Sequence, residues 1–280
     1  MFFYKYDEVE LRCILNFLLF KVKFRPLNYF LRSKFYKFFK LIDDKRFIKK
    51  INKIPKNYKI ISLGTYCFPR VITTYNGLKP KREQGEKSCP FDLAFFNNVD
   101  KNIELINTCF GGLFEKLEYS FPKCNDFQNK KRYWLNYEYS AIFNHEDEFS
   151  RESLVQRYEA RIKNFYDYLN EKGVHKFFII AYSSAIFENT VISLKNVLLK
   201  FMPEKDFSII LINQSRKVNE INLKNVYIIN QYKNYENFLK INKNGEWVNE
   251  LEKRKMPESQ KIYNEVTSGL IEIISNVMKS

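Results

Sequence analysis

Two hydrophobic patterns divide the chain near residue 55. Before it, apolar residues recur every three or four positions, as on one side of a helix, at Phe17, Phe20, Phe24, Leu27, Leu31, Phe35, Phe38 and Ile42. After it, short apolar runs alternate with longer amphipathic stretches, which is typical of a parallel sheet covered by helices on both faces. We therefore expect a basic amphipathic helical segment over residues 1–55 and one α/β domain with a mixed, largely parallel sheet over residues 56–280.

The elements of the α/β domain follow from periodicity and capping signals. Apolar runs or apolar alternation predict strands at 58–63, 137–144, 176–182, 207–212 and 225–230. Amphipathic periodicity predicts helices at 67–76, 102–114, 150–171, 190–201 and 258–278. Ser150 is placed to cap the third of these helices, and the pair Gly111-Gly112 is placed to stop the second.

The composition weakens the evidence from charge. The net charge is +15 and aromatic residues make up 17% of the chain. The abundant Phe, Tyr, Lys, Asn and Ile all have AT-rich codons, so the basic balance reflects codon bias at least in part. The lysines are scattered among acids along the whole chain, and no helix-turn-helix, zinc-finger or RNP-type signature is present. We therefore do not expect a nucleic-acid partner.

The cysteine and histidine counts restrict cofactors and compartment. Five cysteines without a CxxC pair, together with two histidines, give no zinc-ligand spacing, and no glycine-rich phosphate loop is present, so neither metal nor cofactor is expected. Free thiols suit a reducing cytoplasm. No stretch approaches the ~18 apolar residues of a membrane span. Acids precede the short apolar run at 13–20, where a signal peptide would be positive. We expect a cytoplasmic protein.

Residues 9–50 allow two interpretations. Basic side chains fill much of the space between the apolar positions, and Pro26 should break or kink the helix. The segment could be a helical appendage packed on the main domain. It could instead lie as a basic amphipathic helix on the anionic inner face of a membrane, giving peripheral contact with the inner membrane.

The segment from Ser62 to Cys67 is the strongest candidate for chemistry. A predicted strand delivers the chain to Gly64, which permits a tight turn, and Cys67 then falls at a helix N-terminus. Unpaired N–H groups there favour an anion, which should lower the thiol pKa. The backbone N–H groups of residues 64–67, including that of Thr65, could also hold an oxyanion. The alternative is a cysteine that serves as a small buried apolar residue.

A nucleophilic cysteine needs a base, and the chain has only two histidines. His145 follows a predicted strand and is trailed by Glu146 and Asp147, either of which could orient its ring. His145 could equally be an ordinary surface-loop residue. His175 lies after Gly173, on a predicted turn into a strand, and is the weaker candidate.

The segment Ser88-Cys89-Pro90-Phe91-Asp92 also has two interpretations. It could be a turn with a buried Phe91, in which Asp92 caps the element that follows. In the functional interpretation Asp92 points into the pocket of Cys67. There it would orient His145 or, together with Ser88, hold the substrate.

In order and spacing these segments resemble a bacterial family of putative papain-like cysteine peptidases over roughly residues 58–185. Its members carry a Ser-Leu-Gly-x-x-Cys motif, a Ser-x-Pro-Phe-Asp motif usually followed by Trp, a His-Asp pair and an Arg-rich helix. The resemblance implies a Cys–His–acid site made of Cys67, His145 and either Asp147 or Glu146. Two positions depart from the pattern, because Leu93 replaces the Trp and Glu146 directly follows the histidine.

The Arg-rich helix is matched by residues 157–162. Arg157 and Arg161 lie four apart on one helical face, which by itself indicates a solvated or salt-bridged surface. The resemblance instead implies that Arg161 binds an anionic group of the substrate. The β-α-β alternation after residue 176 departs from the mostly antiparallel barrel of papain.

Two functions follow. The first is thiol-dependent acyl chemistry on a peptide, acyl or glycan substrate, with water as acceptor in a hydrolase and a hydroxyl or amine as acceptor in an acyltransferase. The family resemblance adds a link to surface-polysaccharide biosynthesis. The alternative is a non-enzymatic module that binds a small molecule or glycan and uses the same motifs to build a pocket.

Overall fold

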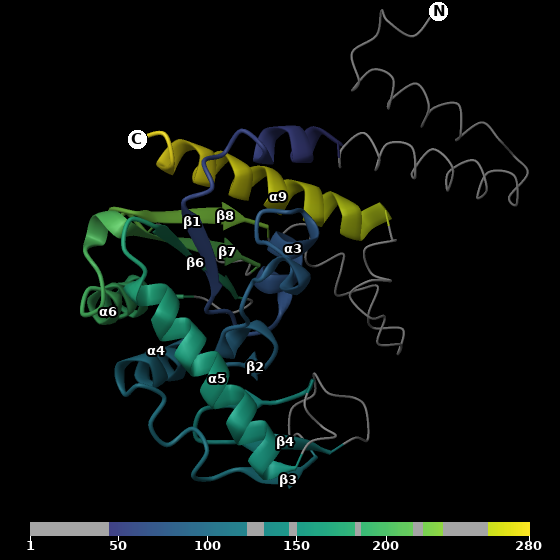
Figure 1. Cartoon of the computed structure of the whole chain (residues 1–280), viewed down its shortest axis with the longest axis vertical. Helices are drawn as coiled ribbons and strands as arrows, with labels where there is room; N and C mark the ends of the chain where they lie inside the picture. Colours follow the sequence, from purple (N-terminus) through teal and green to yellow (C-terminus); the bar gives the residue numbers. More distant parts are fainter. Residues whose placement is uncertain (1–44, 122–131, 146–149, 183–185, 215–220, 232–256) are drawn as a thin grey trace, which may run out of the picture. The chain divides into compact units, whose positions relative to one another are not determined.

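The computed structural model describes residues 45–121, 132–145, 150–182, 186–214, 221–231 and 257–280 (Figure 1). Most of the predicted amphipathic segment and both candidate acids, Glu146 and Asp147, lie outside the described residues. The chain divides into two compact units, residues 1–49 and 50–280. The second unit carries every element discussed below.

The second unit contains a four-stranded parallel sheet with the strand order β1-β6-β7-β8. All residues of β7 are buried, as are all but the first of β6, because helices cover both faces of these central strands. This burial explains their uninterrupted apolar runs and confirms the predicted α/β class. The strands are β1 (Tyr58–Ser62), β6 (His175–Tyr182), β7 (Phe207–Asn213) and β8 (Val226–Asn230).

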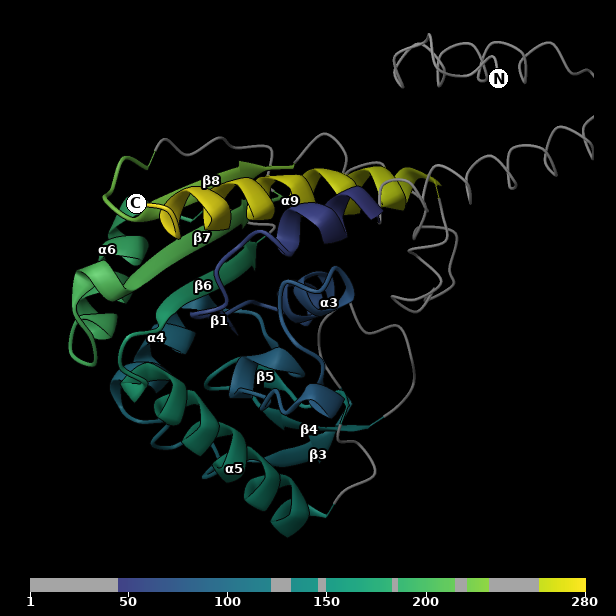
Figure 2. The same ribbon diagram turned by 45° about the horizontal axis from the view of Figure 1, so that its top comes forward.

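Helices lie on both sides of the parallel sheet (Figures 1 and 2). On one face, α3 packs on β1 and β6, and α9 packs on β8 and on α3. On the other face, α4 contacts α6, and α5 continues alongside the second sheet. The helices are α3 (Phe68–Tyr75), α4 (Val99–Asn107), α5 (Arg151–Asn170), α6 (Glu188–Leu198) and α9 (Pro257–Val277).

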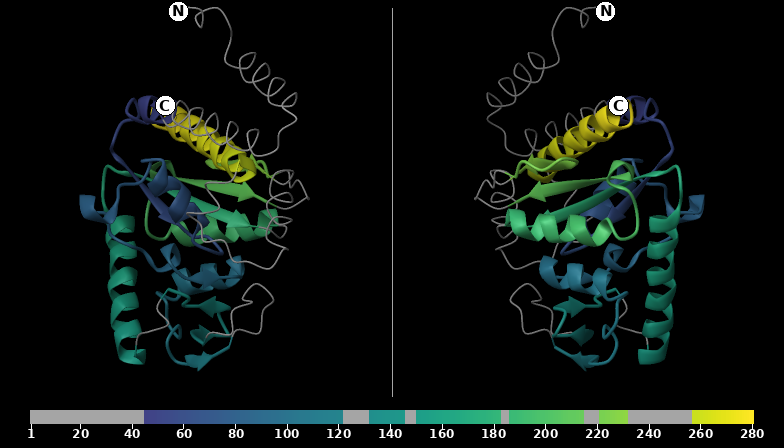
Figure 3. Two further views of the ribbon diagram at one scale, coloured as in Figure 1. Left: turned by 90° about the vertical axis from the view of Figure 1, so that its right-hand side faces the viewer. Right: turned by 90° about the vertical axis from the view of Figure 1, so that its left-hand side faces the viewer.

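A small antiparallel sheet with the order β2-β5-β4-β3 adjoins the parallel sheet (Figure 3). The two sheets are joined where Phe96 N–H of β2 donates to Thr65 O, just after β1 (3.1 Å). This smaller sheet therefore stands at the carboxyl end of β1. Its strands are β2 (Phe95–Phe96), β3 (Glu118–Ser120), β4 (Tyr133–Asn136) and β5 (Ala141–Ile142).

The strand predicted at 137–144 is present only at Ala141–Ile142 (β5), and the rest of the prediction is wrong because residues 137–140 form the turn between β4 and β5. The Asn136 side chain accepts the Tyr139 N–H at 3.2 Å, and Ser140 adopts φ 50°, a left-handed conformation that no strand contains. Apolar and polar residues keep alternating through this tight hairpin, so the alternation could not show that the chain reverses direction there.

The helix boundaries mostly follow the predictions. Ser150 caps α5 as expected, since its Oγ accepts the Ser153 N–H at 3.2 Å. The helix predicted at 102–114 begins and ends earlier, because Cys109 and Phe110 already take left-handed φ values of 53° and 60°. Three short 3₁₀ helices lie between these elements: η1 (Arg82–Gln84), η2 (Pro90–Asp92) and η3 (Glu204–Asp206).

Phe91 of η2 is central to the core between α5 and the two sheets. Its side chain is fully buried, and its ring centroid lies 4.9 Å from that of Phe96, 5.5 Å from Phe110 and 6.4 Å from Phe165. The contacts with Phe96 and Phe165 are edge-to-face, and such contacts stabilise the core beyond the burial of apolar area. The Pro90-Phe91-Asp92 segment is thereby fixed against α5.

We expect Phe91→Ala to lower the free energy of unfolding by about 3–5 kcal/mol, because it removes a buried ring and leaves a cavity among three other rings. Urea denaturation followed by circular dichroism measures this loss. Phe187→Ala is the control, since the Phe187 side chain is 70% exposed and should change stability by about 0.5 kcal/mol or less. Equal losses in the two variants would contradict the structure.

Candidate functional site

Cys67 lies directly before α3 as its N-cap residue, five positions after the last residue of β1. It is half-buried, and its carbonyl oxygen accepts the Val71 N–H at 2.9 Å. Pro69 occupies the first turn of the helix, where the missing N–H costs nothing. The strand, turn and helix predicted around Cys67 are therefore present.

The turn between β1 and α3 is held on both sides. Thr65 Oγ1 donates to Ala181 O of β6 at 2.9 Å, and Tyr66 Oη donates to Gln214 Oε1 beyond the end of β7. At Gly64 the chain passes close to itself, since a Cβ there would lie 3.0 Å from Pro69 Cγ and 3.0 Å from Tyr66 O. Gly64 thus permits the close approach of the turn to the first turn of α3.

His145 is exposed and lies three residues beyond β5. Strand β2 connects the turn before Cys67 to the strand that leads to His145. Its Phe96 donates a backbone hydrogen bond to Thr65 of the turn and pairs with Ala141 of β5. The chain that carries His145 therefore emerges from a strand attached, through β2, to the Cys67 turn. Pairing of His145 with Cys67 remains a prediction.

His175 is the first residue of β6, whereas Cys67 follows the carboxyl end of the parallel neighbour β1, so the two lie at opposite ends of the sheet. The His175 Nε2 is 3.0 Å from Ser208 Oγ. Burial lowers the pKa of His175, so its ring is held neutral over more of the pH range. His175 therefore lies at the amino end of the sheet, away from Cys67, and is not placed to act as its base.

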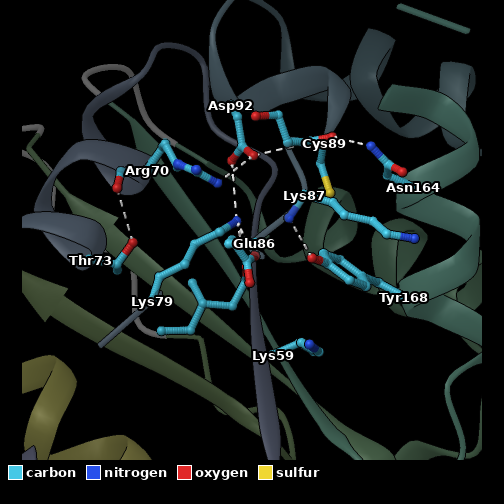
Figure 4. A network of polar contacts seen from close by, with 12 residues as sticks. Lys59, Arg70, Thr73, Lys79, Glu86, Lys87, Cys89, Asp92, Asn164 and Tyr168 are labelled. Atoms are coloured by element: carbon cyan, nitrogen blue, oxygen red, sulfur yellow. Dashed lines mark hydrogen bonds and ion pairs between the residues drawn. The ribbon is translucent and has the colours of Figure 1, made fainter. Parts of the chain in front are cut away.

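Asp92 is fully buried and surrounded by donors (Figure 4). Its Oδ2 accepts the Cys89 N–H at 2.8 Å and lies 3.0 Å from Arg70 Nη1, while its Oδ1 lies 3.5 Å from Lys79 Nζ. Asp92 caps the 3₁₀ helix that it ends, through the N–H of the N-cap residue Cys89, whereas the sequence predicted a cap on the element that follows. Ser88 is half-buried, and its carbonyl oxygen accepts Asn164 Nδ2 of α5 at 3.1 Å.

Arg157 and Arg161 differ in environment although they lie four apart on α5. Arg157 is exposed, whereas Arg161 is only 6% exposed and its guanidinium lies 4.5 Å from the centroid of the Tyr158 ring. Tyr158 in turn packs edge-on against Phe143, two residues before His145. The solvated-surface interpretation therefore holds for Arg157 and not for Arg161.

Two site residues escaped the sequence analysis. Lys79 and Glu86 belong to the Lys-, Gly- and Pro-rich stretch between α3 and η2, yet their side chains are 1% and 2% exposed and lie 3.4 Å apart. Lys79 Nζ also donates to Ile60 O of β1 at 2.8 Å. No local signal distinguishes this buried lysine from an exposed one, because Asp92 and Ile60 O, which also hold it, belong to other segments.

Cys89 is the other thiol near these residues, and it does not fit a nucleophile. It is fully buried, and burial, with the neighbouring Asp92 charge, raises the pKa of its thiol. A raised pKa leaves the thiol protonated, and the protonated form is unreactive. Among the described residues, no group of three or more His, Cys, Asp or Glu side chains could hold a metal ion, and no helix is long and apolar enough to cross a membrane.

Comparison with known proteins gives one family. A family model described as putative papain-like cysteine peptidase matches residues 58–217, which is 160 of the 280 residues. The match includes Cys67, the segment 88–92, His145 and Arg161. No curated protein and no solved structure matches the chain.

The environments of the described cysteines predict an order of reactivity. At about pH 8, Cys109, which is exposed, should react with iodoacetamide in the native protein, whereas Cys89 should stay unmodified until the protein unfolds. Peptide mapping by mass spectrometry with and without urea measures this. Labelling of Cys89 at the rate of Cys109 in the native protein would contradict the burial of Cys89.

Proposed function

The chain belongs to the family described as putative papain-like cysteine peptidase, and from this premise we propose that it is a cysteine hydrolase with Cys67 as nucleophile and His145 as base. The observation that carries the proposal is the position of Cys67 at the N-terminus of α3, directly after a strand of the parallel sheet. Partial positive charge at a helix N-terminus stabilises a thiolate. Cys67 is half-buried, so it retains access to solvent and substrate.

The proposed reaction proceeds in two steps. In the first, His145 removes the Cys67 proton, the sulfur attacks a substrate carbonyl carbon, and His145 returns the proton to the departing amine or alcohol. In the second, water attacks the thioester while His145 takes its proton, releasing a carboxylic acid and restoring the thiol. Either Asp147 or Glu146 orients the His145 ring.

Backbone donors near Cys67 support stabilisation of the oxyanion. Helix geometry leaves the N–H groups of Phe68 and Arg70 without an acceptor inside α3, while Pro69 between them has none to offer. These N–H groups and that of Cys67 lie at the N-terminus of α3, the end of the helix at which Cys67 stands. Preorganised donors of this kind are a large contribution in acyl-transfer enzymes.

The substrate class we propose is a peptide, as family membership implies. Uncharged side chains gather at the carboxyl ends of the neighbouring strands, where Tyr66 bonds to Gln214 and Asn213 Nδ2 donates to Asn230 Oδ1 at 3.0 Å. Ligands of parallel sheets bind at this edge. The amide and phenol side chains of these residues can form hydrogen bonds with uncharged polar groups, which both peptides and sugars contain.

A second candidate function uses the same site with a different acceptor. A sugar hydroxyl in place of water would make the protein an acyltransferase on a glycan, as in surface-polysaccharide biosynthesis, and the neutral side chains at the sheet edge favour this substrate equally. We propose a cytoplasmic protein, with residues 9–50 in peripheral contact with an anionic membrane. Within the site, Gly64, Thr65, Ser88 and Arg161 are the residues we propose to shape or bind the substrate, whereas Asp92 is buried beneath them in ion pairs with Arg70 and Lys79.

The first test is the pH dependence of alkylation at Cys67. We expect an apparent pKa well below the ~8.5 of an ordinary thiol, and we expect His145→Ala to return it toward that value. Rates at each pH come from mass-spectrometric mapping, with Cys109 in the same molecules as internal control. If Cys67 reacts no faster than Cys109, the nucleophile is excluded and the protein is a non-enzymatic binding module.

The acid of the site is tested by two matched variants. If Asp147 orients His145, Asp147→Asn should slow Cys67 alkylation at neutral pH by about tenfold, because a thiolate–imidazolium pair loses its anionic support. Glu146→Gln should then leave the rate within about twofold. The reverse result assigns Glu146, and unchanged rates in both variants would contradict a third acidic member.

A further inference from the structure

Four charged side chains form a buried network beneath α3, and we call Arg70, Lys79, Glu86 and Asp92 the charge network (Figure 4). Lys79 Nζ lies 3.4 Å from Glu86 Oε1 and 3.5 Å from Asp92 Oδ1, and Arg70 Nη1 lies 3.0 Å from Asp92 Oδ2. The side chains of Lys79, Glu86 and Asp92 are at most 2% exposed, and that of Arg70 is 11% exposed. Two cations and two anions thus balance one another, and Arg70 is the member with partial contact with solvent.

The charge network connects the two sequence motifs of the site. Lys79 is anchored on β1 through Ile60 O at 2.8 Å, and Asp92 is anchored on η2 through the Cys89 N–H at 2.8 Å. Arg70 extends into the network from the first turn of α3. The strand that leads to Cys67, the helix that follows it and the 88–92 segment therefore meet at one carboxylate.

A second set of bonds holds the segment 87–92 against α5. The Lys87 N–H donates to Tyr168 Oη at 2.9 Å, and Asn164 Nδ2 donates to Ser88 O at 3.1 Å. Phe91 packs on Phe165 of the same helix. Asp92 therefore projects from a segment fixed independently of α3, and it can serve as a fixed reference point for Arg70.

Stability is a weak explanation for a buried charge network. Buried ion pairs can often be replaced by apolar side chains of similar volume without loss of stability, since desolvation offsets much of the attraction. What such pairs do supply is a defined geometry. Arg70 lies three residues after Cys67, and residues so spaced on a helix are neighbours on one face.

We propose that Asp92 is a positioning residue for Cys67: by fixing Arg70, it holds the first turn of α3 and its donors in place beside the thiolate. This inference rests on the proposed function. It assigns to Asp92 an indirect role, in place of contact with the substrate or with His145. Lys79 connects Asp92 to β1, because it contacts both the Asp92 carboxylate and Ile60 O. Glu86 pairs with Lys79 and balances its charge.

The sign of the effect separates this role from a direct electrostatic one. Removal of a nearby negative charge by itself favours a thiolate, so a direct effect of Asp92→Asn would lower the apparent pKa of Cys67 alkylation. Release of Arg70 and loosening of the first turn of α3 would raise the apparent pKa, because the N–H groups of that turn would no longer be held beside the sulfur. The positioning role therefore predicts a higher apparent pKa.

The experiment is a double-variant cycle read out by Cys67 alkylation against pH. Asp92→Asn keeps an acceptor for the Cys89 N–H but loses its charge, and Arg70→Gln removes the cation. We expect each single variant to alkylate about tenfold more slowly at neutral pH, through a raised apparent pKa. Because Asp92 acts through Arg70, the double variant should be no slower than either single variant.

The double variant also guards against a failure to fold. It leaves Lys79 and Glu86 as a balanced pair, whereas Asp92→Asn alone leaves an excess buried cation. Thermal unfolding of each variant is measured alongside. Glu204→Gln is the matched control, since its ion pair with Lys195 lies before the amino end of β7, at the opposite end of the sheet from Cys67.

Three results overturn the proposal. The first is an unchanged or lowered apparent pKa of Cys67 in Asp92→Asn. The second is a double variant in which the two losses of alkylation rate add, because additive losses mean that Asp92 acts without Arg70. The third is wild-type reactivity of Cys67 in the folded double variant. An ordinary apparent pKa in the wild-type protein is a different result, because it contradicts the proposed function itself.

Discussion

The candidate site depends on one buried carboxylate, that of Asp92. A buried anion must be compensated, and here compensation comes from Arg70 on α3, Lys79 beside β1 and the backbone of Cys89. These donors come from segments that are separate in sequence, so satisfying the carboxylate requires all of them to be in place. The hydrogen bonds and ion pairs of this one carboxylate thus fix the position of α3 relative to the 88–92 segment.

The parallel sheet supplies the rigid frame for this arrangement. Burial of β6 and β7 on both faces fixes their neighbours, and the parallel pairing of β1 with β6 sends the chain out at the edge where Cys67 begins α3. Short side-chain bonds from Thr65 and Tyr66 then attach the turn to the ends of β6 and β7. Rigid strands with a functional turn at their carboxyl ends are the general design of open α/β sheets.

Periodicity predicted the parts of this structure that are governed by burial along a single element. The central strands, the Ser150 cap and the start of α3 at Cys67 are examples, because each leaves its signal in a few adjacent residues. The hairpin at 137–140 was not predictable, since its reversal depends on the Asn136 side chain and a left-handed Ser140. Lys79 was missed for a related reason, because its burial is decided by Glu86, Asp92 and Ile60 O.

The parallel sheet of this chain differs from the mostly antiparallel barrel expected of a papain-like protein. A parallel sheet with a β-α-β succession carries this site, and chemistry of one kind recurs on unrelated folds whenever the local requirements are met. For a cysteine those requirements are a helix N-terminus, a nearby base and donors that do not move as charge develops. The fold meets the first with α3. The charge network then offers a physical reason for the third, because a first turn pinned through Arg70 cannot relax away from the sulfur without exposing or separating buried charges.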